Sequence, residues 1–304
     1  MQVERLSYGK LTHCYRLSNG VIELIIPAEV GLRILHFGFV GERNEFFVTD
    51  PLEVPADRGV WQLYGGHRLW LAPEMEGRTT IPDNQPITVE EHGDVVRLIQ
   101  PKEAVTNVVK EIDIRFEADA ASVEVVHRIH NRNIWDVQLA LWAISVMQLG
   151  GTAIIPLPPR GTHPKDLLPA ATLTLWPYTD LSDPRFRFGR KYVYVSQDTN
   201  ATTPQKIGAA VSSGWAAYAN DGHVFIKQFA HVQGANYPDL RSTVEVFASP
   251  EMIELETLGP LVSIAPSGSA EYRERWTLAK DVPTLNHDDE VDRYVAPLVA
   301  HGAQ

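Results

Sequence analysis

The strongest constraint on the fold is the recurrence of short segments in which apolar and polar residues alternate. In the segment 122–130, for example, Val123, Val125 and Ile129 would lie on one face of a pleated strand. Segments with this strand character recur along the chain: 21–26, 31–40, 95–100, 108–116, 122–130, 137–147, 192–196, 207–211, 223–229, 242–247, 252–258 and 271–278. The 21 glycines and 21 prolines lie mostly between them and mark turns. The pattern predicts a chain built mainly of β-strands.

Helical periodicity is convincing only near the end of the chain. Asp288 is expected to cap a short helix over 290–299, which ends before His301 and Gly302. Many strands with almost no helix indicate an all-β fold, in which two large antiparallel sheets pack face to face. Because no repeat or linker interrupts the pattern, we expect a single domain over 1–285 and a helical tail over 286–304 packed on it.

Composition excludes several classes of protein. The chain has 304 residues, 44% of them hydrophobic and 21% charged, and lacks an apolar run long enough to span a membrane. A formal net charge of -11 disfavours nucleic acid as a partner. Glu4 and Arg5 stand where a signal peptide needs an apolar core, so a cytoplasmic location is expected. Cys14 is the only cysteine, which excludes an internal disulfide and a cysteine-cluster metal site.

Two long stretches, 50–83 and 151–190, are expected to be irregular. Loops of such length in a compact domain usually build binding sites. The first contains GGHRLWLAPE, residues 65–74. The second contains Trp176 and, after it, a basic cluster made of Arg185, Arg187, Arg190 and Lys191.

The segment GGHRLWLAPE combines side chains that suit a sugar pocket. Arg68 offers forked donors to neighbouring hydroxyls, and Trp70 offers an apolar face to the C–H side of a pyranose. His67 and Glu74 are able to exchange protons near neutral pH. The segment therefore indicates a carbohydrate ligand.

The spacing within this segment raises a question of geometry. In a regular strand Arg68 and Trp70 would point to one face and His67 to the other. The glycines Gly65 and Gly66 permit a bulge or bend, which is expected to turn His67 to the side of Arg68. The alternative is that Arg68 pairs with a carboxylate such as Glu74, Trp70 fills the core and His67 is merely hydrogen-bonded.

A second group of candidate residues lies in MIELETLGPL, residues 252–261. Glu254 and Glu256 would share a face of an extended strand, with Cα atoms about 6.6–7 Å apart. On a cleft wall, repulsion and desolvation would raise at least one pKa and give a general base. The alternative is that both glutamates lie on a solvated outer face.

Glu245 lies on the preceding strand, after a turn over 236–239 that contains Tyr237. If the two strands pair, Glu245 joins the surface of the other two glutamates, and Arg68 or Lys227 would supply a neutralising cation. Tyr237 is expected either to contact the ligand or to pack over the turn.

Other candidate residues carry weaker signals. His127 and His130, three residues apart on a strand, would face opposite sides, which disfavours a shared metal ion. The basic cluster over 185–191 would bind a phosphate or carboxylate, or else form a solvated loop. The sequence contains no Gly-rich phosphate loop, GxSxG elbow or HExxH pair. We therefore expect no cofactor and no metal ion.

Taken in order, the region 31–39, GGHRLWLAPE, ALWAISVMQLGG, YPDLRSTVEVFASPEMIELETLGPL and YRERWTL resemble the galactose mutarotase-like superfamily, and in particular its DUF4380-type members. The resemblance implies a β-supersandwich fold. The superfamily includes aldose 1-epimerases, hexose-6-phosphate mutarotases and carbohydrate-binding domains of larger enzymes.

The resemblance also implies roles for individual residues. In the catalysts of the superfamily a late-strand glutamate accepts the proton of the anomeric hydroxyl, while a histidine donates one to the ring oxygen. Glu256 matches the glutamate, and His67 with Arg68 resembles the sugar-contacting pair. The chain departs from the pattern over 139–149, where the mid-strand acid histidine is absent.

These inferences lead to two hypotheses. The first is a protein that binds a monosaccharide or sugar acid and epimerises its anomeric centre, with Glu256 as base and His67 as acid. The rival is a non-catalytic carbohydrate-binding or sensing module, and a third reading is a different sugar-directed isomerase or lyase. The expected ligand contacts are shared by all of them: Arg68, Trp70, Glu74, Trp176, Tyr237, Glu245 and Glu254. The sequence indicates neither the sugar nor an oligomeric state.

Overall fold

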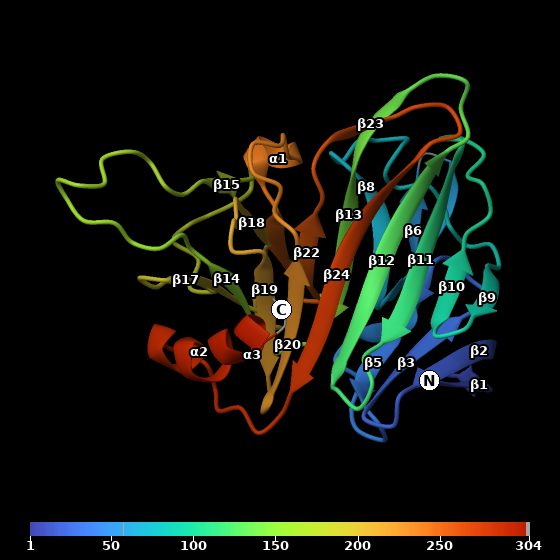
Figure 1. Ribbon diagram of the computed structural model, residues 1–304, viewed down its shortest axis with the longest axis horizontal. Coiled ribbons are helices and arrows are strands. Elements are labelled where there is room, and N and C mark those ends of the chain that lie inside the picture. The colour runs from blue at the N-terminus through green and yellow to red at the C-terminus, as the bar shows by residue number, and fades with distance from the viewer. Residues whose placement is uncertain (57, 302–304) are drawn as a thin grey trace.

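Two large antiparallel sheets form the body of the protein (Figure 1). The computed structural model describes residues 1–56 and 58–301. The ten-stranded sheet has the order β16 (Phe186–Phe188), β17 (Tyr192–Ser196), β14 (Thr152–Pro156), β19 (Trp215–Asn220), β20 (His223–Phe229), β24 (Ser269–Ala279), β12 (Ser122–Asn131), β11 (Val108–Phe116), β10 (Val95–Ile99) and β9 (Thr88–His92). The eight-stranded sheet has the order β15 (Leu173–Leu175), β18 (Gln205–Ala209), β21 (Val244–Ala248), β22 (Ile253–Leu258), β13 (Val137–Met147), β8 (His67–Ala72) and β4 (Arg33–Ile34), with β23 (Val262–Ile264) paired to β13.

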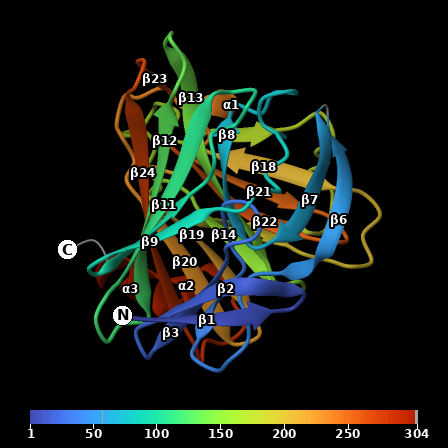
Figure 2. The same cartoon turned by 90° about the vertical axis from the view of Figure 1, so that its right-hand side faces the viewer.

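Two smaller sheets complete the strands. One has the order β1 (Gln2–Tyr8), β2 (Leu11–Ser18), β3 (Ile22–Pro27) and β5 (His36–Phe39). The other is a hairpin of β6 (Val48–Ala56) and β7 (Gly59–Gly65). Figure 2 shows this hairpin on the right of the view. Because Trp61 of the hairpin packs on Trp70 of β8, with ring centroids 5.2 Å apart, the hairpin covers part of that sheet.

The main hydrophobic core lies between the two large sheets. Strand alternation explains it, because every second residue of a strand points to the same side. From the ten-stranded sheet, Val123, Val125 and Ile129 of β12 are fully buried in this core. Leu69 of β8 and Leu255 of β22 face them from the eight-stranded sheet. The eight-stranded sheet thus has a core-facing side and a second, outer side.

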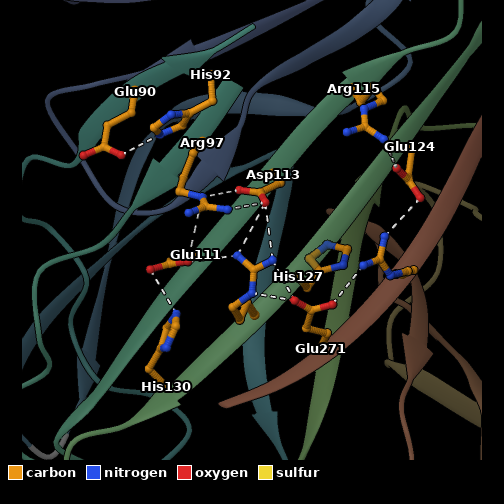
Figure 3. A network of polar contacts seen from close by, with 12 residues as sticks. Glu90, His92, Arg97, Glu111, Asp113, Arg115, Glu124, His127, His130 and Glu271 are labelled. Atoms are coloured by element: carbon orange, nitrogen blue, oxygen red, sulfur yellow. Dashed lines mark hydrogen bonds and ion pairs between the residues drawn. The ribbon is translucent and has the colours of Figure 1, made fainter. Parts of the chain in front are cut away.

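The outer side of the ten-stranded sheet carries a ladder of ion pairs (Figure 3). Arg128 is shared between Glu111 at 3.0 Å and Glu271 at 2.7 Å. Arg97 pairs with Asp113 at 2.7 Å on the neighbouring strands. These side chains neutralise one another across paired strands, as cross-strand neighbours of opposite charge do.

The all-β fold predicted from the sequence is confirmed, as is a short helical region at its end. The predictions of irregular structure over 50–83 and 151–190 were wrong in part. The first stretch contains the hairpin β6–β7 and strand β8, and the second contains β14, β15 and β16. Strand β6 includes Pro51 and Pro55, which interrupted the expected pattern, and a hairpin tolerates them because one edge of each strand is free.

The C-terminal helix differs from its prediction. Two helices, α2 (Asp288–Tyr294) and α3 (Ala296–His301), replace one, because Pro297 lacks the amide donor that a continuous helix needs. His287 rather than Asp288 is the N-cap, and the Glu290 carboxylate accepts its backbone N–H at 2.9 Å. The predicted boundary at Gly302 lies outside the described residues.

None of the described helices is long and apolar enough to cross a membrane. A short helical turn, α1 (Pro238–Arg241), precedes β21, where the sequence predicted a turn. The division into a domain over 1–285 and a tail over 286–304 stays a prediction.

Gly65 and Gly66 fix the start of β8. Both have positive φ values, 82° and 71°. A side chain at Gly66 would collide with the backbone oxygen of Ile34, and its carbonyl accepts the backbone N–H of Val146 at 2.9 Å. The close approach of three backbone segments therefore requires glycine here.

We expect Gly66→Ala to be much more destabilising than Gly41→Ala. Gly41 has a similar φ of 74°, but a Cβ added there would meet no atom within 4 Å. The Gly41→Ala variant therefore measures the loss of stability caused by the positive φ alone. Overpacking at Gly66 should lower the free energy of unfolding by about 1–3 kcal/mol more than the change at Gly41. Urea denaturation of both variants measures this difference, and equal losses would contradict the close-approach explanation.

Candidate functional site

Five strands bring polar and aromatic side chains together on the outer side of the eight-stranded sheet. Glu245 on β21 is the register partner of Glu256 on β22, and Ile144 on β13 links Glu256 to Arg68 on β8. Directly opposed residues point to the same face, so the alternation of each strand places these side chains on one surface. The acidic cluster is defined here as Glu245, Glu254 and Glu256 with the cations Arg68 and Lys206.

Lys206 of β18 lies at the centre of the acidic cluster. Its Nζ is 2.9 Å from Glu245 Oε2 and 2.9 Å from Glu256 Oε2. Trp142 Nε1–H donates a second hydrogen bond to Glu256 Oε2 at 2.8 Å. Glu245 and Glu256 are fully buried, and Glu256 Oε1 and Glu245 Oε1 accept no hydrogen bond from any described residue. Buried carboxylate oxygens therefore remain free to accept a hydrogen bond or a proton.

Arg68 forms the other half of the cluster. Its Nη2 donates to Glu254 Oε1 at 3.0 Å, while its Nε and Nη1 are buried without a partner among the described residues. The guanidinium lies over the rings of Trp61 and Trp70, 4.6 and 4.2 Å from their centroids. Aromatic packing fixes the plane of the guanidinium and leaves donors available.

Burial and charge shift the ionisation of this cluster. Burial raises the pKa of Glu245 well above its usual range, and the charge of Glu256 raises it further, while Lys206 opposes both. Burial likewise raises the pKa of Glu254, against the effect of Arg68. Three carboxyl groups share two cations, so full ionisation would leave one uncompensated negative charge. Burial and mutual repulsion therefore favour a proton on one of these carboxyl groups.

Aromatic side chains cover Lys206. The rings of Trp142 and Trp176 lie on it, each with its centroid 4.8 Å from Nζ. Trp176 belongs to a tight turn in which Thr179 N–H donates to the Trp176 carbonyl at 2.9 Å. The chain leading to this turn, between β14 and β15, projects from the body in Figure 1.

The arrangement provides the components of proton exchange. Glu256 offers an unpartnered oxygen, Oε1, while its Oε2 lies 2.9 Å from Lys206 Nζ. Glu245 has a raised pKa and lies beside it, which provides a proton donor. General acid–base chemistry needs a proton acceptor and a proton donor held near the reacting group.

Among the residues singled out from the sequence, the structure brings Arg68, Glu245, Glu254 and Glu256 together, and Trp176 lies against Lys206. Glu74 is exposed at the edge of this group, and its charge helps to raise the pKa of Glu254.

Trp70 and Tyr237 lie differently from the expectation of a sugar contact. Trp70 is buried in a cluster with Trp142, and its ring contacts the guanidinium of Arg68 and the ring of Trp61. Tyr237 accepts the backbone N–H of Val232 at its hydroxyl, at 2.8 Å, and stacks on His231. Both match the packing alternatives.

The prediction that His67 turns to the side of Arg68 was wrong. His67 is fully buried on the core-facing side of β8, edge-on to Trp276 with centroids 4.5 Å apart. The bend at Gly65 and Gly66 precedes β8, so regular alternation resumes at His67 and sends it away from Arg68. His67 therefore cannot reach a ligand held by the acidic cluster.

His67 instead joins a hydrogen-bonded chain between the two large sheets. Ser145 Oγ–H donates to His67 Nδ1 at 2.9 Å, and His67 Nε2–H donates to His127 Nε2 at 2.8 Å. His127 Nδ1–H then donates to the carbonyl oxygen of Tyr272 at 3.2 Å. With these tautomers every nitrogen of both neutral imidazoles has a partner.

Glu274 lies beside this pair, and the three side chains present donor atoms within 4.8 Å of one another. Two histidines and a glutamate are a donor set that zinc uses. Here, however, Lys227 Nζ lies 3.1 Å from Glu274 Oε1, and Trp276 Nε1–H donates to Oε2 at 2.8 Å. A buried ammonium already neutralises the glutamate, so the group does not fit a metal ion. Lys227 was a predicted partner of the acidic cluster, but it pairs with Glu274 instead. Lys206 is the lysine that pairs with Glu245 and Glu256.

The basic cluster over 185–191 does not form a shared anion site. Arg185 is buried and pairs with Asp183 at 2.8 Å, and Lys191 pairs with Asp292. Arg187 lies on the ring of Tyr194, 3.6 Å from its centroid. His130 pairs with Glu111 on the opposite face of β12 from His127, as expected.

Sequence reasoning missed Lys206, Trp142 and Trp61. Lys206 is the second residue of β18 and is followed by small and apolar residues, and a lysine within such a strand is an available signal. Strand parity could have placed Trp142 on the same face as the acidic cluster, because it lies two residues from Ile144 on β13. Trp61 carried no such signal, since its hairpin was expected to be a loop.

Comparison with solved structures identified proteins that have the same architecture. The structure is similar to a candidate aldose 1-epimerase from Klebsiella pneumoniae, with a TM-score of 0.56, 11% identity, and 98% of this chain and 86% of that chain covered. It is also similar to a candidate aldose 1-epimerase from Escherichia coli K12, with a TM-score of 0.55, 13% identity, and coverages of 88% and 99%. The fold is that of the galactose mutarotase-like proteins.

A galactose mutarotase-like protein from Lactobacillus casei gives a similar result, with a TM-score of 0.51, 9% identity, and coverages of 88% and 100%. No family model and no curated protein matches the sequence. The similarity of the structures therefore shows a mutarotase-like β-sandwich. Sequence identities this low do not assign an activity to this chain.

The buried histidine pair predicts a loss of stability in acid. Burial lowers the pKa of His127 to about 4 and that of His67 well below its usual range. The unfolded chain takes up protons below pH 6.5, whereas the folded pair resists until about pH 4, so the free energy of unfolding falls as pH decreases through this window. His127→Gln should reduce the loss between pH 7 and pH 5 by about 2 kcal/mol.

Urea denaturation at the two pH values measures this effect. His92→Asn is the matched control, since His92 is exposed on β9 and pairs with Glu90, and it should retain the pH dependence of the unmodified chain. An unchanged pH dependence in His127→Gln would contradict the explanation.

Proposed function

We propose that the protein binds a carbohydrate at the acidic cluster and exchanges its anomers there. The observation that carries the proposal is that buried, unpartnered carboxylate oxygens of Glu245 and Glu256 share one face of the sheet with the unpartnered donors of Arg68. Sugar hydroxyls both donate and accept, so they would satisfy the two kinds of atom together. The indoles of Trp142 and Trp176 suit the C–H face of a pyranose.

Glu256 is the base of the proposed reaction. Its Oε1 takes the proton of the anomeric hydroxyl, the bond between the anomeric carbon and the ring oxygen breaks, and the ring oxygen receives a proton from the Glu245 carboxyl group. Closure on the other face of the carbonyl reverses these transfers. Lys206 holds Glu256 Oε2 at 2.9 Å, which leaves Oε1 for the ligand, and the raised pKa of Glu245 suits it as the acid.

The remaining roles follow from position. Arg68 holds a hydroxyl or carboxylate of the ligand, Glu254 orients Arg68, and Glu74 with Trp176 lies at the rim. His67 does not enter this scheme. We place the chain with the DUF4380-type members of the superfamily, because their motifs GGHRLWLAPE and ELETLGPL supply Arg68, Glu254 and Glu256. A cytoplasmic location stays a prediction of the sequence.

A non-catalytic carbohydrate-binding module is the second candidate. The position of His67 on the core-facing side favours it, because the histidine acid of the superfamily's catalysts has no counterpart in contact with Glu256 among the described residues. This candidate uses the same binding contacts without proton exchange.

We expect Glu256→Gln to abolish anomeric exchange while preserving affinity. The amide cannot act as a base, so the rate should fall by about 10²–10⁴. Lys206 keeps its pairing with Glu245 in the variant, which leaves two carboxyl groups with two cations in the cluster. Thermal shift with D-glucose, D-galactose and their uronic acids identifies ligands, and polarimetry of freshly dissolved anomers measures exchange.

Glu91→Gln, an exposed glutamate on β9, is the control and should behave as the unmodified chain. Full exchange activity in Glu256→Gln would reject Glu256 as base. Ligand-induced stabilisation of the unmodified chain without any exchange would establish the binding module instead.

A further inference from the structure

An apolar hollow lies between the β6–β7 hairpin and the outer side of the eight-stranded sheet. Its volume is about 250 Å³. Side chains from both layers form it, and most of them are apolar: Phe47, Leu52, Leu63, Val146, Leu149 and Met252. The proposed chemistry does not use this hollow, and packing leaves Leu52 at its wall 49% exposed.

The hollow adjoins the acidic cluster through the strand register. Val146, in its floor, is the register partner of Glu254, and both point to the outer side of the sheet. Opposed residues of an antiparallel pair have Cβ atoms about 4.5–5.5 Å apart. Glu254 also binds Arg68 at 3.0 Å, so the ion pair of Arg68 and Glu254 is the part of the acidic cluster that neighbours Val146.

The hairpin gives a second connection. Leu63 lines the hollow, and Trp61, two residues earlier on β7, lies against Arg68. Leu63 also belongs to the buried group that contains Trp61, Trp70 and Trp142, and Met252 packs against that group. The apolar wall thus continues from the aromatic side chains of the polar site into the hollow.

Size and chemistry restrict the occupant. Pockets that hold a whole drug-sized ligand enclose about 300–1,000 Å³, so this hollow suits part of a ligand. A sugar ring, with hydroxyls on most of its carbons, would leave those hydroxyls unpaired against Val146 and Leu63. An alkyl, acyl or aryl group would instead gain from leaving water.

We propose that the hollow binds an apolar substituent of the same carbohydrate whose ring lies at the acidic cluster. The inference rests on the proposed function and narrows the class of ligand. The ligand becomes a sugar derivative with a hydrophobic group of a few carbon atoms. The substituent meets the Arg68–Glu254 pair at the junction, and the ring lies beyond it against Trp142 and Trp176.

Paired glycosides test this inference by isothermal titration calorimetry. Methyl and hexyl β-D-glucopyranoside, and the corresponding galactopyranosides, differ by five methylene groups and leave the ring unchanged. The hexyl compound should bind at least about tenfold more tightly than the methyl compound of the preferred sugar. A glycoside has no free anomeric hydroxyl, so binding is measured without exchange.

Leu52→Asp places a charge in the wall of the hollow and should remove most of the preference for hexyl while leaving methyl glycoside affinity unchanged. Leu181→Asp is the matched control, because Leu181 is also 49% exposed and does not line the hollow. Its preference should equal that of the unmodified chain.

Three results would overturn the inference. Equal affinity for methyl and hexyl glycosides would reject the hollow as a subsite and leave the proposed function standing. A hexyl preference that survives Leu52→Asp would place the hydrophobic contact elsewhere. Binding of neither glycoside nor free sugar would overturn the proposed function and this inference with it.

Discussion

The alternation of side chains across the eight-stranded sheet is the constraint on which the rest of this structure depends. Strands β8, β13, β22 and β21 pair in one register, which places Arg68, Glu254, Glu256 and Glu245 on a single face. A slip of one residue would exchange the two faces of a strand. The glycine pair before β8 matters because it starts the strand in the register that sends Arg68 outward.

The same alternation separates two buried polar systems by one sheet. On the core-facing side, the nitrogens of the two neutral imidazoles have hydrogen-bond partners, and Lys227 pairs with Glu274. On the outer side, Lys206 serves two carboxylates and leaves oxygens without partners. Buried polar groups that lack partners are costly in a purely structural role. The contrast between the two systems, more than the fold, marks the outer side as the candidate site.

Strand parity made much of the site predictable. Glu254 and Glu256 share a face because they are two residues apart, and the turn before β21 allowed the pairing that adds Glu245. Parity also predicted that His67 faces away from Arg68. A bend at Gly65 and Gly66 was instead expected to turn His67 towards Arg68, and that expectation was wrong. The sequence could not reveal that His67 meets His127, because that contact joins residues 60 positions apart on different sheets. Lys206 was missed for a similar reason, since its partners lie on other strands. The all-β class with two packed sheets was predictable from alternation, whereas the supersandwich was implied by the resemblance and the hairpin with its prolines was not predicted.

The ladder of ion pairs on the ten-stranded sheet has a consequence for how the molecule responds to its solution. Its outermost members are well exposed, as with Arg273, whose side chain is 58% accessible, so dissolved salt reaches them and weakens their attraction. Lys206, enclosed by carboxylates and indoles, is shielded from mobile ions. Ionic strength therefore acts unequally on the two sides of the protein, loosening its charged exterior wall while the interior charge balance persists.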